Sequence, residues 1–231
     1  MYKRQINGTV GATSFSNLSI NVFILGFNHN ASREGSNRIH FKIGKIGGTQ
    51  VGLCDSSYGS STSTSGKFTM NTSNTNSGGW AGSHMRTTVL GSDTTPTSPR
   101  ANTLLAALPA DLRAVMKPIT KYSDNTGGGS NTASYVTSTT DYLPLLSEFE
   151  VQGARSYANS AEQNYQQQYA YYQAGNSKVH YKHDATGTAA YAWCRSVRAA
   201  GTYGFCLVNT DGSASYSNAY YSWAVAPGFA A

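Results

Sequence analysis

The chain has 231 residues, a formal net charge of +6 and only 12% charged residues. This length suffices for one hydrophobic core and is marginal for two. The low charge, together with abundant Gly, Ser, Thr, Asn and Tyr, favours short strands and long loops over a helical bundle. The Lys and Arg residues are scattered, which argues against nucleic-acid binding, and no stretch approaches the ~20 apolar residues of a membrane-inserted helix.

The N-terminal part is predicted to form strands. The opening "MYKRQINGTVG" is basic but lacks the apolar core of a signal peptide, so we expect synthesis in the cytoplasm, and "QINGTV" is strand-like. An apolar run spans Val22–Phe27, and "RIHFKIGKI" alternates apolar residues with His40, Lys42 and a glycine, the period of a half-buried strand. The Ser/Thr/Asn/Gly-rich segment 56–77 is expected to be a surface loop, anchored by Phe68 and a methionine.

Helical periodicity is clear only in "TPTSPRANTLLAALPADLRAVMKPI". Ser98 is predicted as the N-cap, with Pro99 at the first helical position. Pro109 then ends this helix and begins a second one, in which Val115 is spaced for burial and which Pro118 ends. We expect the two helices to pack on a sheet.

The C-terminal part is predicted to return to strands. The stretch "ANSAEQNYQQQYAYYQAG" is expected to be partly helical and to lie on the surface. Three short strands are expected near Tyr191–Arg195, Tyr203–Asn209 and Ser222–Ala226, with a turn at Asp211–Gly212. No internal repeat or linker divides the chain, so a single α+β domain over residues 1–231 is the simplest account.

No constellation of residues indicates catalysis. His180 and His183 are expected on the surface, because an extended segment points them to opposite sides. Glu148 and Glu150 do not face one another on a helix, so a glycosidase pair is unfavourable and one of them is expected to cap or pair locally. The glycine runs match no nucleotide motif and no acidic cluster suits calcium, so no catalytic residue, metal or cofactor is assigned. Other polar residues are isolated or belong to a structural polar network: His29, His40 and His84, and Arg86 and Asp141.

The three cysteines leave alternatives open. The chain has an odd number of cysteines, and none of them has CxxC spacing: Cys54, Cys194 and Cys206. A zinc site and a disulfide framework are therefore both unfavourable, although one pair could still bridge. Cys194 and Cys206 lie on successive predicted strands, where a copper or redox dithiol is conceivable. Unpaired thiols used as small hydrophobes are commoner in a cytoplasmic product.

The last predicted strands have the composition of binding loops. From Ala199 to Trp223, Tyr and Trp are mixed with Ser, Gly, Asn and Ala, between apolar anchors such as Phe205 and Val208. Tyr gives a large contact area at low entropic cost, and small polar residues adapt to a partner. A polar edge hairpin without a partner is the alternative, and the aromatic residues near predicted turns favour binding.

Several motifs follow in fixed order over nearly the whole chain: "GGWAGSHMR", "LLAALPADLRAVMKPITK", "DYLPLLSEFEVQGARSY" and "WCRSVR…YGFCLVNTDGS…VAPGF". In these the chain resembles an uncharacterised domain of Firmicutes and their prophages, which ends in W-W-x-R-S-P and G-V-x-P-x-F segments. Ala192 and Val197 depart from that pattern, which has Trp and Pro there. The resemblance implies an α+β, C-type-lectin-like fold related to the formylglycine-generating-enzyme group, with short antiparallel strands, two helices and long polar loops.

The resemblance also implies a function. In related domains the C-terminal block is rewritten by diversity-generating retroelements, and known proteins of this type are phage tail tropism determinants or bacterial surface ligand-binders. The implied scaffold residues are Trp193, Arg195, Ser196, Phe205, Cys206, Gly212, Pro227 and Phe229. The expected variable region is about residues 191–223, with these ligand-binding residues: Ala192, Cys194, Ala199, Ala200, Thr202, Tyr203, Gly204, Leu207, Asn209, Asp211, Ser213, Tyr216, Asn218, Tyr220, Tyr221 and Trp223.

We therefore expect a receptor-binding protein of a phage tail or an adhesin of a bacterial surface. Its expected partners are a cell-surface protein or glycan of a bacterial host, other tail or surface subunits, and copies of itself, as in a trimer. Two alternatives stay open. One is an oxidoreductase using Cys194 or Cys206, by analogy with the formylglycine-generating group, and the other is a structural tail protein without a receptor.

Overall fold

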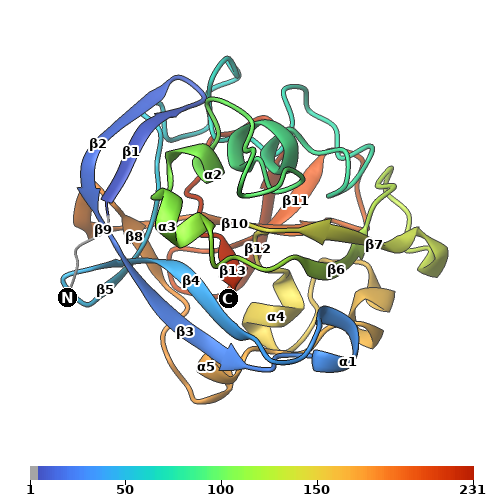
Figure 1. Cartoon of the computed structure of the whole chain (residues 1–231). Coiled ribbons are helices and arrows are strands. Elements are labelled where there is room, and N and C mark those ends of the chain that lie inside the picture. The colour runs from blue at the N-terminus through green and yellow to red at the C-terminus, as the bar shows by residue number, and fades with distance from the viewer. Residues whose placement is uncertain (1–4) are drawn as a thin grey trace.

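The structure, a computed structural model, describes residues 5–231, so the expectation about a signal peptide falls partly on residues 1–4, outside the described part. Strands hold 34% of the residues and helices 16%, in several small sheets (Figure 1). The expected α+β class with a C-type-lectin-like fold is therefore wrong, because the chain is β-rich. No helix within residues 5–231 exceeds six residues. Pro109 follows α2 (Leu104–Ala107), and glycines follow η1 (Met85–Leu90) and α4 (Glu148–Gln152), which stops each of these helices after one or two turns.

The described residues form short elements throughout. The strands are β1 (Gln5–Val10), β2 (Thr13–Ser19), β3 (Asn21–Phe27), β4 (Ile39–Ile46), β5 (Thr49–Gly52), β6 (Ile119–Asp124), β7 (Val136–Asp141), β8 (His180–Lys182), β9 (Ala185–Ala190), β10 (Ala192–Val197), β11 (Gly204–Val208), β12 (Ala214–Asn218) and β13 (Gly228–Ala230). The helices are α1 (Ala31–Glu34), the π-helix η1 (Met85–Leu90), α2 (Leu104–Ala107), α3 (Ala110–Arg113), the 3-10 helices η2 (Ala133–Tyr135) and η3 (Ser160–Asn164), α4 (Glu148–Gln152) and α5 (Ala170–Gln173).

The largest sheet joins the two ends of the chain. Its order is β13-β4-β5-β8-β9, and β3 also pairs with β4. The β5–β8 pair is parallel and the other pairs are antiparallel. Phe229 of β13 lies opposite Phe41 of β4, and the two rings stack at 5.2 Å. The last strand of the chain is thus held by a strand from its beginning.

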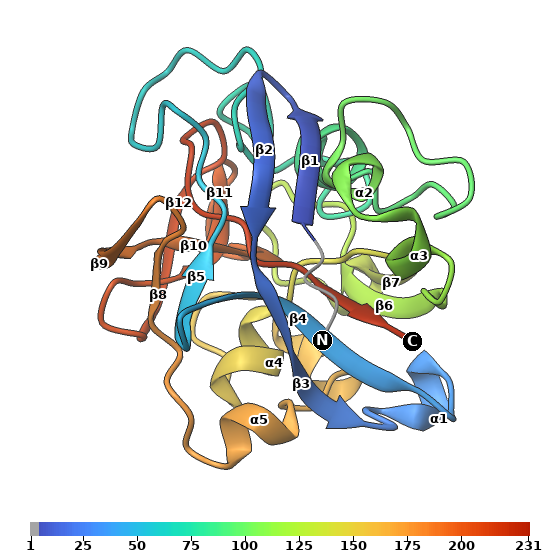
Figure 2. The ribbon, with the colours of Figure 1, turned by 60° about the vertical axis from the view of Figure 1, so that its left-hand side comes forward.

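A second, three-stranded antiparallel sheet has the order β10-β11-β12. Every residue of β10 and β11 is buried, whereas every residue of β12 is half-buried. β12 pairs with β11 and with no other strand of the described residues, so it is an edge strand. The remaining described strands form two antiparallel pairs, β1–β2 and β6–β7. Figure 2 shows β1 and β2 above β3 and β4.

Several sequence predictions are confirmed in the N-terminal half. β1, β3 and β4 lie where the strands were expected, and segment 56–77 contains no helix or strand. Phe68 is buried as its anchor. The predicted alternation in β4 is wrong, because His40 and Lys42 are both buried. Their side chains lie beneath Tyr169 and Tyr172, so β4 is covered on this face as well.

The helix predictions need correction. α2 begins after Thr103, whose side-chain oxygen accepts a hydrogen bond from Ala106 N at 3.3 Å, so Thr103 rather than Ser98 is the N-cap. The second helix ends at Arg113, and Val115 beyond it is 51% exposed instead of buried.

The C-terminal strands also differ in part from the prediction. β10, β11 and the turn at Gly212 are confirmed, and Gly212 has the positive φ of 88° that such a turn needs. β12 and β13 were missed. Segment 222–226 makes only isolated bridges, through Ser222, Ala224 and Val225.

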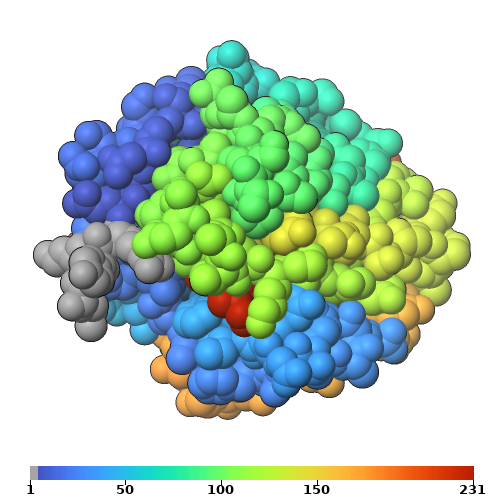
Figure 3. Space-filling model, viewed as in Figure 1, coloured from blue at the N-terminus to red at the C-terminus, as the bar shows by residue number. Residues whose placement is uncertain are grey.

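The largest cluster of buried apolar residues includes residues of both sheets. Trp193 and Phe229 are buried in it, as expected for scaffold residues, and Trp80 is buried there as well. The expected polar network is confirmed, because Arg86 Nε donates to Asp141 Oδ1 at 2.7 Å. On the face in Figure 3, the C-terminal segment shows as only a small red patch between green and blue ones. Within residues 5–231, no helix has the length and apolar character needed to span a membrane.

Candidate functional site

The structure divides the sixteen expected ligand-binding residues into two groups. Eleven are exposed or half-buried: Ala200, Thr202, Tyr203, Asn209, Asp211, Ser213, Tyr216, Asn218, Tyr220, Tyr221 and Trp223. The other five are buried, four of them on β10 or β11: Ala192, Cys194, Ala199, Gly204 and Leu207. The five buried residues belong to the frame in this conformation and do not present their side chains to a ligand.

An aromatic surface cluster surrounds Trp223. We call Tyr58, Tyr191, Tyr220, Tyr221 and Trp223 the Trp223 cluster. The Trp223 ring lies 5.0 Å from that of Tyr191, 5.2 Å from Tyr58 and 6.0 Å from Tyr221, and Tyr220 packs on Tyr221 at 4.8 Å. The Tyr58 hydroxyl accepts a hydrogen bond from Tyr191 N at 2.7 Å, which ties the 56–77 loop to the start of β10. All five residues are half-buried, so their rings are held in place while part of each faces solvent.

The indole of Trp223 has an unusual environment. Its Nε1 is covered and has no hydrogen-bond partner among the described residues. A buried N–H donor without a partner costs about 1–3 kcal/mol. An acceptor would remove that cost, but it reaches this N–H only if the side chains that cover the atom move apart.

A second cluster lies around Arg198, and we call Tyr157, Arg198, Tyr203 and Tyr216 the Arg198 cluster. The Arg198 guanidinium carbon lies 3.8 Å from the Tyr216 ring centroid, and its Nη1 donates to the Tyr203 hydroxyl at 3.1 Å. Tyr157 meets Tyr216 edge-on at 4.9 Å. The cation–π contact holds Arg198 against the Tyr216 ring, and the hydrogen bond holds it to the Tyr203 hydroxyl.

Sequence reasoning missed four members of these clusters: Tyr58, Tyr157, Tyr191 and Arg198. Tyr58 lies in segment 56–77, which was expected to be a surface loop. The only sequence feature that could have indicated its role is that it is an aromatic residue in a polar loop. Tyr157 and Arg198 carry no local pattern, because β12 brings Tyr216 to them from outside their own segments.

A buried ion-pair network supports the sheet beneath these clusters. Arg195 of β10 is fully buried and bonds to both carboxylate oxygens of Glu150, with Nη2–Oε1 at 3.0 Å. Lys121 donates to Glu150 at 2.8 Å and to Glu34 at 2.6 Å. Burial alone would raise the pKa of Glu150, but Arg195 and Lys121 hold it well below its usual range. Glu150 also completes a capping box with Ser147 at the start of α4, which confirms the expectation of a local cap or pair.

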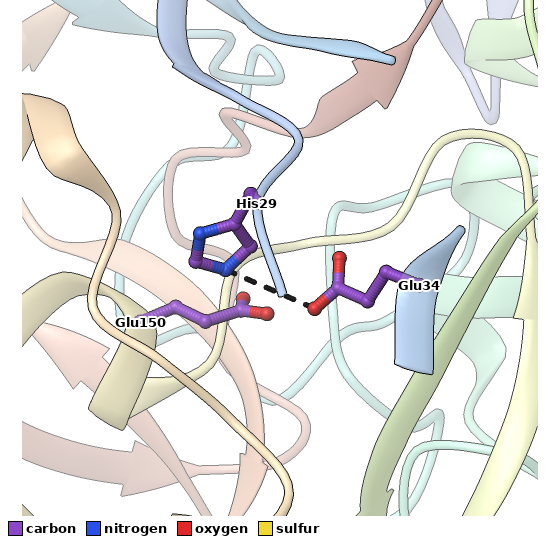
Figure 4. Close-up of side chains that lie close together, drawn as sticks. All are labelled: His29, Glu34 and Glu150. Carbon is purple, nitrogen blue, oxygen red and sulfur yellow. Dashed lines mark ion pairs between the residues drawn. The ribbon is translucent and has the colours of Figure 1, made fainter. Parts of the chain in front are cut away.

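His29, Glu34 and Glu150 are the group among residues 5–231 best placed to hold a metal, with ligand atoms within 4.8 Å of one another (Figure 4). His29 Nε2 lies 3.8 Å from Glu34 Oε1. Burial, and then the charge of Lys121, lowers the pKa of His29 to about 3, so the ring is neutral. The two carboxylates are already matched by Lys121 and Arg195. A divalent ion would add positive charge beside two buried cations, so this group is better suited to structural support than to metal binding.

The histidines are less isolated than their positions in the sequence indicate. His180 is buried, not on the surface, and its Nε2 lies 2.6 Å from Lys42 Nζ. Burial lowers the pKa of Lys42 to about 7. His183 is half-buried and its Nδ1 accepts from Cys54 N at 3.1 Å. His40, expected to have no role, lies with its Nδ1 3.9 Å from Glu34 Oε2.

The three thiols are free and buried. Burial raises the pKa of Cys54 to about 12, and it raises the pKa of Cys194 and Cys206 well above the usual value. Nucleophilic attack and metal binding both need the thiolate. The environment of these cysteines is therefore that of small apolar core residues.

A comparison with protein families adds one match. A family model covers residues 61–230, which is more than half of the chain. The chain belongs to the family described as Domain of unknown function (DUF6273). No curated protein and no solved structure matches it. The DUF6273 match starts after β5 and ends with β13, and it contains the Arg198 cluster and all of the Trp223 cluster except Tyr58. Two of its strands, β8 and β13, pair with β5 and β4 outside the matched segment.

Proposed function

We propose that the chain is a ligand-binding protein and that the Trp223 and Arg198 clusters form its binding surface. The observation that carries this proposal is the Trp223 cluster, a group of half-exposed aromatic rings around an indole N–H that lacks a partner. Aromatic and Arg side chains supply much of the binding energy at protein surfaces. Rings that are already ordered lose little entropy on binding.

The frame under this surface supports the proposal. β10 and β11 are buried throughout, and Arg195 anchors β10 to Glu150. Side chains on the half-buried edge strand β12 and on the turns around it can change without disturbing that frame. This is the arrangement that a diversified binding surface needs, and the sequence resemblance to retroelement-diversified proteins points the same way.

The partner that we propose is a protein or glycan of a bacterial cell surface, with the chain displayed on a phage tail or on another bacterial surface. Several copies on one particle would make weak single contacts sufficient.

The test is binding of the fluorescently labelled chain to a panel of intact Firmicutes cells. Replacing the ring in Trp223→Ser should weaken binding to any recognised cell by about tenfold or more, the size of a hot-spot loss. Phe27→Ser is the matched control, because Phe27 is 66% exposed and belongs to neither cluster. Thermal unfolding of each variant would show that it remains folded. Equal binding by Trp223→Ser and the unchanged chain would contradict the proposal, and an absence of binding to every cell would favour a structural tail protein.

A further inference from the structure

A surface cavity of about 480 Å³ opens at the end of β12 where the Asp211–Gly212 turn lies. One wall is this turn, and the other is the segment between α5 and β8. Its lining includes Gln152, Tyr172, Lys178, Asp211, Gly212 and Ser213. Neither aromatic cluster contributes a residue to it.

The two walls are tied together. Gln152 Nε2 donates to Gly212 O at 3.1 Å, and Lys178 Nζ donates to Gln152 Oε1 at 2.9 Å. Gly212 has a φ of 88°, and a Cβ there would come 3.3 Å from Val179 Cγ2 in the opposite wall. A glycine therefore lets the turn approach the other wall closely, and Gln152 sets the spacing.

The lining has unused hydrogen-bonding capacity of both kinds. Lys178 gives one of its three N–H donors to Gln152. Asp211 Oδ1 accepts from the Ser213 N and hydroxyl at 2.9 and 2.6 Å, and these bonds lower the pKa of Asp211. Asp211 Oδ2 accepts no bond from the described residues. One small cavity thus presents free donors on one wall and a free acceptor on the other.

We propose that this cavity binds a neutral polyhydroxylated ligand, such as a sugar residue. A hydroxyl group donates and accepts with one atom, so it matches a wall that donates and a wall that accepts. The single positive charge of Lys178 and the single negative charge of Asp211 balance, so the cavity has no net attraction for an ion. Asp211 is exposed, and water screens its attraction for an ammonium group.

This inference rests on the proposed function, because the turn belongs to the same C-terminal block. It adds a polar subsite, separate from the two aromatic clusters, that determines the class of ligand. A free sugar and a residue within a cell-wall glycan present the same hydroxyl chemistry to it.

The test is an NMR titration of the full chain, following the amides of Gly212 and Ser213. The probes are the methyl glycosides of glucose, galactose and N-acetylglucosamine, a soluble cell-wall polysaccharide fragment, and glycine and sulfate as charged probes. At least one neutral glycoside should give a saturable shift. Stronger binding of the polysaccharide fragment than of any methyl glycoside would identify a glycan, and the reverse would identify a free sugar.

Two variants locate the binding. Asp211→Asn keeps the acceptor for Ser213 and replaces the free carboxylate oxygen, and Lys178→Met removes the donors. Each should weaken glycoside binding by about tenfold, the loss expected for one hydrogen bond to a charged group. Asp184→Asn is the control, because the Asp184 side chain is 65% exposed on another turn. The inference would be overturned if both variants bound glycosides as tightly as the unchanged chain does. Preference for glycine or sulfate over the glycosides, or no shift with any probe, would also overturn it.

Failure of this inference and failure of the proposed function give different results. If no glycoside binds while Trp223→Ser still weakens cell binding, the proposed function stands and the polar subsite falls. If glycosides bind and Trp223→Ser leaves cell binding unchanged, the subsite stands and the aromatic surface falls.

Discussion

Arg195 anchors β10, in the sheet beneath the proposed binding surface, to neighbouring segments. Besides Glu150, its guanidinium donates to Ser123 Oγ at 2.8 Å and to Leu145 O at 2.9 Å. Removing one partner of a buried ion pair leaves the other charge without compensation, which typically costs about 3–5 kcal/mol. We expect Arg195→Met to lower the free energy of unfolding, measured by urea denaturation, by about that amount.

Arg100 provides the matched control for this prediction. It also makes a bidentate ion pair, with both Asp93 oxygens at 3.0 Å, but its side chain is 43% exposed. Arg100→Met should cost less than about 1 kcal/mol because water screens the pair. Equal losses in the two variants would mean that burial of the Arg195 pair contributes nothing.

Residue patterns predicted the burial of some side chains and not of others. Burial of Trp193 and Phe229 was expected from their motif context. Burial of His40 and Lys42 was not, because a strand that alternates polar and apolar residues reads as half-exposed. Tyr169 and Tyr172, distant in the sequence, cover the polar face and bond to those side chains. Only tertiary structure brings these residues together.

At the scale of elements, α2 begins at a different residue from the one that the sequence predicts. Ser98 followed by Pro99 is a favourable helix start, yet residues 98–103 form turns and the helix begins after Thr103. Thr103 is fully buried, and its hydroxyl also donates to Arg100 O at 2.7 Å. We expect Thr103→Ala to reduce the free energy of unfolding by about 1–2 kcal/mol, as the loss of a helix cap does.

Ser98→Ala is the companion variant. Ser98 lies in a turn where its N donates to Thr95 O, a bond that alanine retains. Its effect on urea denaturation should therefore stay within about 0.5 kcal/mol. A larger loss at Ser98 than at Thr103 would show that the helix begins where the sequence predicted.

The strands were predictable where apolar residues recur and not elsewhere. β3 and β4 contain the apolar run and the alternation that identify strands. β12, with the sequence ASYSN, has one large side chain in five residues, and it is a strand because β11 supplies its hydrogen-bond partners. Composition and the family resemblance together pointed to the exposed residues of the candidate site, while Tyr58, Tyr157, Tyr191 and Arg198 depend on packing that neither specifies.

At the scale of the whole molecule, the family match and the folded unit have different bounds. The match begins at residue 61, yet β13 pairs with β4 and β5 pairs with β8. A fragment of residues 61–231 would expose the face of Phe229 that packs on Phe41 and leave β13 paired only by its bridge to Lys117. We expect this fragment to lack the dispersed amide spectrum of the full chain in a two-dimensional NMR experiment. A native-like spectrum would mean that strands β1–β5 are dispensable.

The central claim is that a fixed frame carries a variable binding surface, and sequencing the gene's 3′ end across many cells or virions of the source population tests it most directly. The account predicts substitutions at the exposed and half-buried positions, such as Tyr216, Tyr221 and Trp223, and constancy at the buried Arg195 and Cys194. A uniform sequence, or substitutions spread equally over buried and exposed positions, would contradict it.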